Sequence, residues 1–260
     1  MSRFFARRDI YVVPLVYLLF GLLLTLSQNR LIYLPDNRPF GECPRLPPDA
    51  ELIDGSFRGY YFPSQNETLV VIYHGNAGNA CHRSIYASWL AELTVSVLVV
   101  EYPGFADPYS RPSTRRSLAM VPSVVEWVEQ QSYQSVHLIG ESIGSGFASY
   151  HSTHDAPDTL VLITPFARLS ERAQEAVLIY PARWLLFADL DVATWAASAP
   201  RIHIIAAETD SVVPRHHTDR VVAALPEETT TVHIIPGTDH NTLYGSLRFQ
   251  QALREAIAQE

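Results

Sequence analysis

The sequence predicts an α/β fold with a mostly parallel central sheet flanked by helices, and three observations support this prediction. Short, continuous apolar runs, typical of strands buried on both faces, recur along the chain and alternate with segments of helical spacing. A glycine-rich turn with the pattern Gly140-x-Ser142-x-Gly144 joins one of these runs to a helix-compatible run. The chain has 260 residues, of which 47% are hydrophobic, and this is enough for one domain with a full core.

Charge and cysteine content argue against several classes of function. The formal net charge is −8, which argues against nucleic-acid binding. The two cysteines, Cys43 and Cys81, lack the tight Cys and His spacing of a metal site, so we expect no bound metal. If the domain lies outside the cytoplasm, these cysteines could form a disulfide that closes a long loop, and the alternative is two unrelated thiols.

We predict that residues 1–28 form an uncleaved signal anchor that holds the protein in the membrane. Three arginines precede an almost wholly apolar run, residues 10–26, whose 17 residues span about 25 Å as a helix. That length is at the short end for a bilayer crossing. A cleaved signal peptide needs small residues at its cleavage site, which residues 25–28 lack. A buried core helix is hard to place at a terminus that begins with three arginines.

The same segment predicts where the rest of the chain lies. By the positive-inside rule the first arginines stay in the cytoplasm, so the domain is predicted to be extracytoplasmic. Three arginines beyond the apolar run weaken this orientation. Residues 29–49 are rich in proline and are predicted to form an extended connector, and residues 50–260 form the folded domain.

Within the domain, seven segments are predicted to be extended and three to be long helices. The first extended segment alternates polar and apolar residues and ends at a proline, which predicts an antiparallel strand or hairpin. The other six are short apolar runs that predict buried strands. The extended segments are residues 51–62, 69–73, 95–100, 136–139, 159–163, 201–206 and 230–235, and the helices are residues 80–93, 115–131 and 243–258.

The turn around Ser142 is the centre of the functional prediction. Gly-x-Ser-x-Gly between a strand and a helix is the nucleophile-elbow pattern of the α/β-hydrolases. The tight turn lifts the serine hydroxyl off the sheet edge, and the absence of a Cβ at Gly140 and Gly144 lets strand and helix approach closely. The pattern alone is weakly specific, because a serine in any glycine-rich strand–helix turn matches it.

Two further residues follow later strands at the same edge of the predicted sheet. Asp210 comes shortly after the sixth extended segment, with Glu208 as the alternative acid, and His240 lies in the loop after the seventh. The order Ser142, Asp210, His240 is the order of nucleophile, acid and base in α/β-hydrolases. We therefore predict a catalytic triad in which His240 deprotonates Ser142 and Asp210 fixes the imidazole.

A glycine-rich turn after residues 69–73 is predicted to complete the site. The backbone N–H groups of Asn76 and Ile143 are expected to hold the oxyanion of a tetrahedral intermediate. His74, at the start of this turn, is expected to brace the loop by hydrogen bonds and not to act as a base. Glu141, next to the serine, is given no catalytic role.

Three motifs together resemble the Bem46-type, ABHD13/ABHD17-like branch of the α/β-hydrolases, over roughly residues 50–258. They are His-Gly-Asn-Ala-Gly-Asn at residues 74–79, the acidic-Tyr-x-Gly turn at residues 101–104, and the serine elbow. The resemblance implies a membrane-associated serine hydrolase, and some members of that branch are protein depalmitoylases. The sequence departs from the pattern after Gly104, because relatives often continue with a second glycine where Ala106-Asp107-Pro108 stands here.

These observations predict a membrane-anchored serine hydrolase that cleaves carboxylic ester or thioester bonds, with acyl chains reaching the site from the lipid side. In this architecture the insertion at about residues 165–200 forms a cap, whose Trp and Phe side chains either line an acyl pocket or pack in the cap's own core. A serine peptidase or amidase and a non-catalytic surface binding protein are the competing hypotheses. The triad needs no cofactor, and the expected partners are the membrane and an acyl ester or thioester, either a small molecule or a lipidated substrate.

Overall fold

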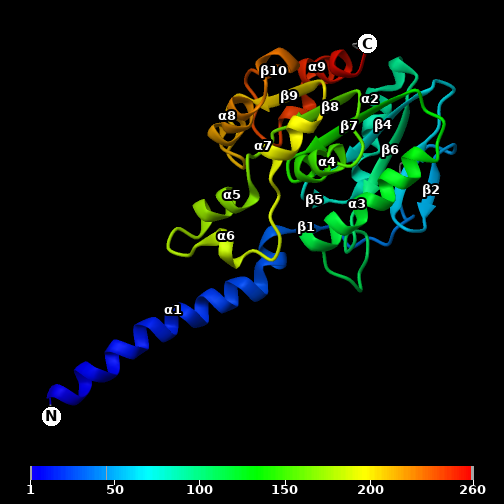
Figure 1. Cartoon of the computed structure of the whole chain (residues 1–260). Helices are drawn as coiled ribbons and strands as arrows, with labels where there is room; N and C mark the ends of the chain where they lie inside the picture. Colours follow the sequence, from blue (N-terminus) through cyan, green and yellow to red (C-terminus); the bar gives the residue numbers. More distant parts are fainter. Residues whose placement is uncertain (1, 45, 259–260) are drawn as a thin grey trace.

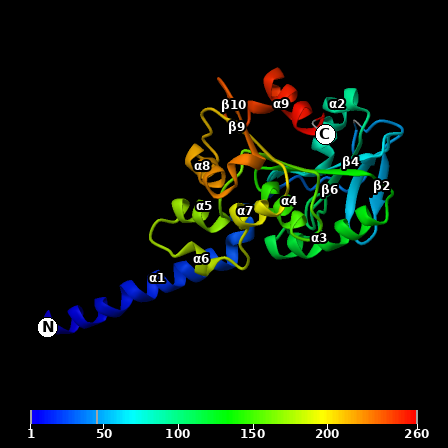
Figure 2. The same ribbon diagram turned by 45° about the horizontal axis from the view of Figure 1, so that its top comes forward.

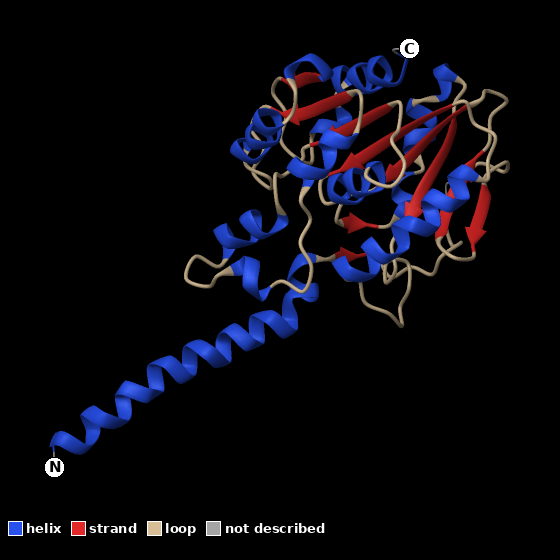
Figure 3. Ribbon diagram, in the orientation of Figure 1, coloured by secondary structure: helices blue, strands red, loops and turns tan. Residues whose placement is uncertain are grey.

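The computed structural model describes residues 2–44 and 46–258, with an eight-stranded sheet at its centre (Figure 1, Figure 3). The strand order is β10-β9-β8-β7-β4-β6-β3-β2, and neighbouring strands are parallel except that β3 is antiparallel to both β2 and β6. The strands are β2 (Glu51–Asp54), β3 (Arg58–Phe62), β4 (Thr68–Tyr73), β6 (Ser96–Glu101), β7 (Ser135–Glu141), β8 (Thr159–Ile163), β9 (Ile202–Ala207) and β10 (Thr230–Ile235). The predicted mostly parallel sheet, with a hairpin at one edge, is confirmed.

Helices cover both faces of this sheet and complete two apolar cores. Side chains alternate along each strand, so Val71 and Tyr73 join one core while Val70 and Ile72 join the other. The helices on the first face are α3 (Thr114–Glu129), α4 (Gly144–Ser152), α7 (Val192–Trp195) and α8 (Arg215–Ala224), and those on the second are α2 (Ile85–Trp89) and α9 (Leu247–Ala258). Burial on both faces explains why the central strands are continuous apolar runs.

The single helix predicted over residues 80–93 is wrong, because the segment is broken into short turns. It contains η1 (Ala80–Arg83), α2 and η2 (Ala91–Leu93). Its start is fixed by tertiary contacts, since the Ala80 N–H donates to the Glu101 carboxylate at 3.0 Å. Helical spacing in the sequence carries no information about such contacts.

The N-terminal helix α1 (Ser2–Ile32) projects away from the body of the molecule, as two views show (Figure 1, Figure 2). Its part Tyr11–Ile32 is long and apolar enough to cross a membrane. The helix continues past residue 28, the predicted end of the anchor, because no proline interrupts it before Pro35. The chain then forms strand β1 (Leu34–Pro35), which pairs with β5 (Ala77–Gly78) in the loop after β4.

Cys43 and Cys81 form a disulfide, which decides between the two alternatives that the sequence left open. The bond joins the proline-rich segment to η1 across a sequence separation of 38. The same segment also contacts Ala106, whose N–H donates to the Asp36 carbonyl at 3.1 Å and whose carbonyl accepts the Phe40 N–H at 3.0 Å. Ala106 has φ 47°, a left-handed conformation that glycine adopts more readily.

Two helices of the predicted cap, α5 (Leu169–Ala176) and α6 (Ala182–Leu185), lie between the sheet edge and α1 (Figure 1). The prediction for the cap's aromatic side chains is wrong for Trp184 and Phe187. They are 76% and 59% exposed, so they neither line a pocket nor pack in a core. Trp195 instead packs against Tyr150 of α4, with ring centroids 5.0 Å apart.

Candidate active site

Ser142 lies on a tight turn between β7 and α4. Its φ is 52°, a conformation rarely adopted by a residue with a side chain, and its N–H donates to the Ile163 carbonyl at 2.8 Å. The two flanking glycines are required sterically. A Cβ at Gly144 would lie 2.0 Å from the Tyr73 carbonyl oxygen, and one at Gly140 would lie 2.6 Å from the Ser145 Cα. The backbone thus has the strained geometry of a nucleophile elbow.

Asp210 and His240 meet at the same edge of the sheet. His240 Nδ1 lies 2.7 Å from Asp210 Oδ2, and the other carboxylate oxygen accepts the N–H groups of Val212 and Val213 at 2.9 and 2.7 Å. The Asp210 side chain is only 4% exposed, so its orientation is fixed by these contacts. Glu208, the alternative acid, instead accepts the Gly237 N–H at 2.8 Å.

The predicted oxyanion loop is braced from two sides. His74 is fully buried, with Nδ1 2.7 Å from the Gly75 carbonyl and Nε2 3.3 Å from Glu101, which confirms its bracing role. The Asn76 side chain holds the end of α1, since its Nδ2 donates to the Ile32 carbonyl at 2.5 Å and its Oδ1 accepts the Leu34 N–H at 3.2 Å. The loop beside Ser142 is therefore tied to the N-terminal helix.

Glu141 forms a buried ion pair directly beside Ser142. Arg83 donates to it from Nε at 2.9 Å and from Nη2 at 2.5 Å. Burial alone would raise the pKa of Glu141, but the Arg83 guanidinium outweighs burial and holds this pKa below its ordinary value. A Cβ at Gly75 would lie 2.3 Å from a Glu141 carboxylate oxygen, so the ion pair packs closely under the oxyanion loop.

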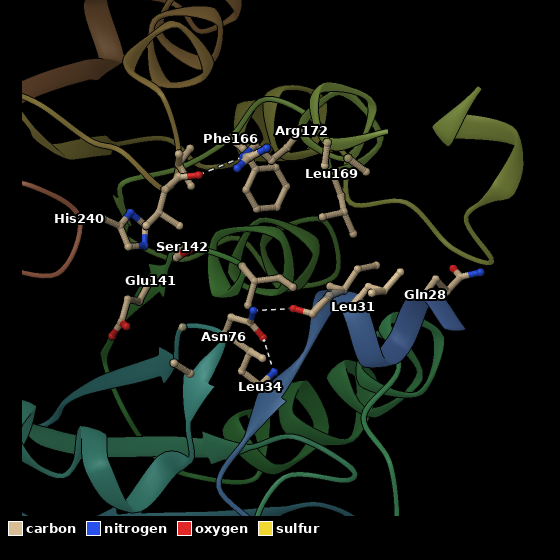
Figure 4. Close-up of a pocket in the computed structure, with 18 of the residues that line it drawn as sticks. Gln28, Leu31, Leu34, Asn76, Glu141, Ser142, Phe166, Leu169, Arg172 and His240 are labelled. Atoms are coloured by element: carbon tan, nitrogen blue, oxygen red, sulfur yellow. Dashed lines mark hydrogen bonds between the residues drawn. The ribbon is translucent and has the colours of Figure 1, made fainter. Parts of the chain in front are cut away.

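A cavity of about 800 Å³ joins these residues (Figure 4). Ser142 and His240 face it side by side, and the predicted oxyanion residues Asn76 and Ile143 also line it. All the predicted site residues except the buried Asp210 therefore line this cavity, and Ser142 and His240 lie on the wall at the edge of the sheet. The volume is within the range of sites for drug-sized ligands.

The opposite wall contains residues that the sequence did not suggest. It comes from the end of α1 and from the cap, and it is mostly apolar. Its members include Leu24, Gln28, Leu31, Leu169, Arg172, Val177, Leu185 and Leu186. No local sequence signal pointed to this wall, because Gln28 follows the apolar run and lies among other polar residues, Ser27, Asn29 and Arg30.

Among the described residues, one cluster has the composition of a metal site. Glu175, His216 and His217 place their ligand atoms within 4.8 Å of one another. The Glu175 carboxylate lies 2.7 Å from His216 Nε2 and 3.1 Å from His217 Nε2, so it contacts both imidazoles. None of the three lines the cavity beside Ser142.

No protein-family model matches the chain. Among solved structures it is similar to the Pyrococcus furiosus esterase PF2001, with TM-score 0.63 and 13% identity, covering 86% of this chain and 96% of that one. It is also similar to Est1E from Butyrivibrio proteoclasticus with bound ferulic acid, with TM-score 0.62 and 17% identity, covering 81% of this chain and 100% of that one. These likenesses establish the fold, which is that of the α/β-hydrolases.

Relatives in sequence cover most of the chain. The uncharacterized protein Rv2307c of Mycobacterium tuberculosis is 32% identical over 229 residues, which is 83% of this chain and 81% of the relative. The uncharacterized protein YfhR of Escherichia coli K12 is 26% identical over 248 residues, which is 89% of this chain and 82% of the relative. The chain belongs to the same family as this mycobacterial protein.

Proposed function

We propose that the protein is a membrane-anchored serine hydrolase that cleaves carboxylic ester or thioester bonds of acyl substrates. The observation that carries the proposal is the 2.7 Å contact between His240 Nδ1 and Asp210 Oδ2, because His240 also lines the cavity that Ser142 faces from its strained turn. In this arrangement the second imidazole nitrogen is available to the serine hydroxyl.

The proposed reaction has two steps. His240 takes the Ser142 proton as the Oγ attacks the acyl carbonyl, and the backbone N–H groups of Asn76 and Ile143 hold the oxyanion. Collapse of the intermediate passes the proton to the leaving alcohol or thiol and leaves an acyl-enzyme. Water then attacks the acyl group with the same base, which releases the acid and restores the hydroxyl.

We further propose that the domain lies outside the cytoplasm and belongs to the Bem46-type branch. The Cys43–Cys81 disulfide supports the location, because such bonds persist in oxidising compartments. The arginines that precede the apolar part of α1 support the same orientation. A reporter at the C-terminus that is active only in the cytoplasm should give no signal, and a signal would overturn the proposed location.

The assignment to the Bem46-type branch is supported by the motifs at residues 74–79 and 101–104. Its test is thioesterase activity on an S-acylated peptide. We expect the protein to hydrolyse this thioester. If it hydrolysed oxygen esters but not the S-acylated peptide, the assignment to the Bem46-type branch would be contradicted.

The direct test of the function is labelling with a fluorophosphonate probe followed by a hydrolysis profile. The wild type should be labelled and Ser142→Ala should not. The wild type should hydrolyse p-nitrophenyl acyl esters and acyl thioesters faster than aminoacyl anilides. Folded wild type that takes no label, or equal labelling of Ser142→Ala, would overturn the proposal, whereas faster anilide turnover would favour an amidase.

A further inference from the structure

The cap carries exposed apolar side chains on the segment that joins and follows α5 and α6, residues 177–187, here called the cap loop. Large exposed apolar groups in one segment are typical of protein or membrane contact surfaces. The most exposed are Leu178 (81%), Ile179 (73%), Trp184 (76%) and Phe187 (59%). The only charged residue in the segment is Arg183.

The cap loop packs against the part of α1 that is apolar enough to cross a membrane. Tyr180 stacks on Tyr17, with ring centroids 4.4 Å apart, and its hydroxyl donates to the Tyr17 carbonyl at 3.1 Å. Gly21 makes room for this ring, because a Cβ there would lie 3.1 Å from it. Tyr17 precedes Leu26, the last residue of the apolar run, by nine positions, or about 13 Å of helix. If α1 crosses the bilayer, the cap loop must enter it too.

Several polar backbone groups of the cap loop form hydrogen bonds with other groups of the protein, so they do not need water as a partner. The Ile179 carbonyl accepts the Tyr17 hydroxyl at 2.7 Å, and the Leu178 carbonyl accepts Gln174 Nε2 at 3.3 Å. The Tyr180 N–H donates to the Val177 carbonyl at 2.7 Å. A non-helical segment survives at membrane depth only where its backbone groups are satisfied in this way. The flexible stem of Arg183 is long enough to bring its guanidinium toward lipid headgroups.

The space between the cap loop and α1 adjoins the cavity of the candidate active site. A second hollow of about 450 Å³ is lined by Phe20 and by residues 178–180, and it shares Leu24, Ala176 and Val177 with the main cavity. The side chains named along this path are apolar or aromatic. An acyl chain could therefore follow α1 from the bilayer toward Ser142.

We propose that the cap loop is immersed in the bilayer beside α1. The acyl chain of the substrate then enters the candidate active site laterally, from the bilayer leaflet that contains the cap loop. The substrate class is a membrane-resident lipid ester. This substrate assignment rests on the proposed hydrolase function, whereas immersion of the loop does not.

Immersion is tested on the full chain in phosphatidylcholine vesicles. Because the two native cysteines are joined, Ile179→Cys can be labelled alone with bimane and quenched by doxyl-labelled lipids. The matched control is Leu247→Cys, which is 79% exposed on α9, far from α1 (Figure 1, Figure 2). We expect roughly threefold or stronger quenching at position 179 than at position 247. Equal quenching at the two positions would overturn the proposal, whatever the activity.

Lateral access is tested with Trp184→Asp, which alters the cap loop but no residue lining either hollow. A charge at membrane depth is costly, so hydrolysis of a long-chain ester within the vesicle should fall about tenfold or more. Hydrolysis of a soluble butyrate ester should stay within about twofold, and Leu247→Asp should change neither rate. An unchanged rate on the vesicle ester, with soluble turnover intact, would overturn lateral access. No soluble turnover by the wild type would instead overturn the proposed function.

Discussion

The two walls of the active-site cavity are built in different ways. The sheet wall carries Ser142, His240 and the oxyanion loop, which follow the ends of β7, β10 and β4 in one sheet. The helical wall joins α1 to the cap through contacts between residues far apart in sequence, such as the hydrogen bond from Gln28 to the Leu185 carbonyl, 157 positions away. In the proposed hydrolase, the first wall provides the groups for the chemistry, and the second wall determines which substrates reach them.

The largest effect is expected on the sheet wall, from Asp210→Asn. The amide cannot hold the imidazole in the required tautomer, so kcat should fall by about 10³- to 10⁴-fold with little change in thermal stability. Rates on a soluble p-nitrophenyl ester, with melting curves for both proteins, measure this.

Glu208→Gln is the matched control, because Glu208 accepts a backbone N–H at the end of the neighbouring strand. It should lose far less activity. If the two variants lost equal activity, Asp210 would not be the acid of the triad.

A second prediction concerns stability beneath the sheet wall. Arg83→Met leaves the Glu141 carboxylate buried without its cation, which typically costs about 3–5 kcal/mol. The double variant Arg83→Met/Glu141→Gln should recover part of this loss, because the buried charge is then removed. Chemical unfolding of the three proteins at neutral pH measures the difference.

The same ion pair predicts a pH dependence. In the wild type the pKa of Glu141 is lowered from 4.5 on folding, so the pair stabilises the fold above that pH and the contribution is lost as pH falls. In Arg83→Met the strongest group that lowers this pKa is absent, so burial raises the pKa and the penalty disappears on acidification. The difference in unfolding free energy should therefore begin to shrink above pH 4.5, as the carboxyl of the variant takes up its proton, and should shrink further below pH 4.5, as the stabilisation by the wild-type pair is lost. A constant difference would contradict the assignment.

The proline-rich segment connects the two walls, and its disulfide should contribute the next largest effect. The bond closes a loop with a sequence separation of 38, which corresponds to about 3–4 kcal/mol in the chain-entropy estimate. Cys43→Ser/Cys81→Ser should melt roughly 10 °C lower than the wild type. Dithiothreitol should lower the wild-type midpoint toward that of the variant and leave the variant unchanged. Equal midpoints without reductant would mean that the bond contributes nothing.

The sheet wall could be predicted from the sequence for a physical reason. Strands buried on both faces are short apolar runs, and the ends of parallel strands meet at one edge, so the order of Ser142, Asp210 and His240 was enough to bring them together. The strained turn at Ser142 and the glycines beside it could also be predicted, because both depend only on residues that are adjacent in the sequence.

The helical wall could not be predicted in this way, because its contacts leave no periodic signal. The apolar run of α1 predicted a membrane helix, but nothing in that run predicts that Tyr17 stacks on Tyr180. The exposed Trp184 and Phe187 were expected to point inward, since large aromatic side chains are usually buried in a water-soluble domain. That expectation fails where the solvent is proposed to be lipid.

The smallest effect is expected from Gln28→Leu, which tests whether the helical wall is a fixed structure. Gln28 is only 7% exposed, donates to the Leu185 carbonyl at 3.0 Å and accepts the Phe187 N–H at 2.8 Å. Leucine would leave both groups of the cap without their partner, at a cost of about 1–3 kcal/mol.

Thr25→Val is the matched control on the same helix. It removes one bond to the Gly21 carbonyl, at 2.9 Å, which the helix backbone also uses. Its cost should stay within about 0.5 kcal/mol. Melting curves in one detergent compare the two variants. Equal midpoints would mean that the cap moves freely against α1, and the helical wall would then be a mobile cover with no fixed path for an acyl chain.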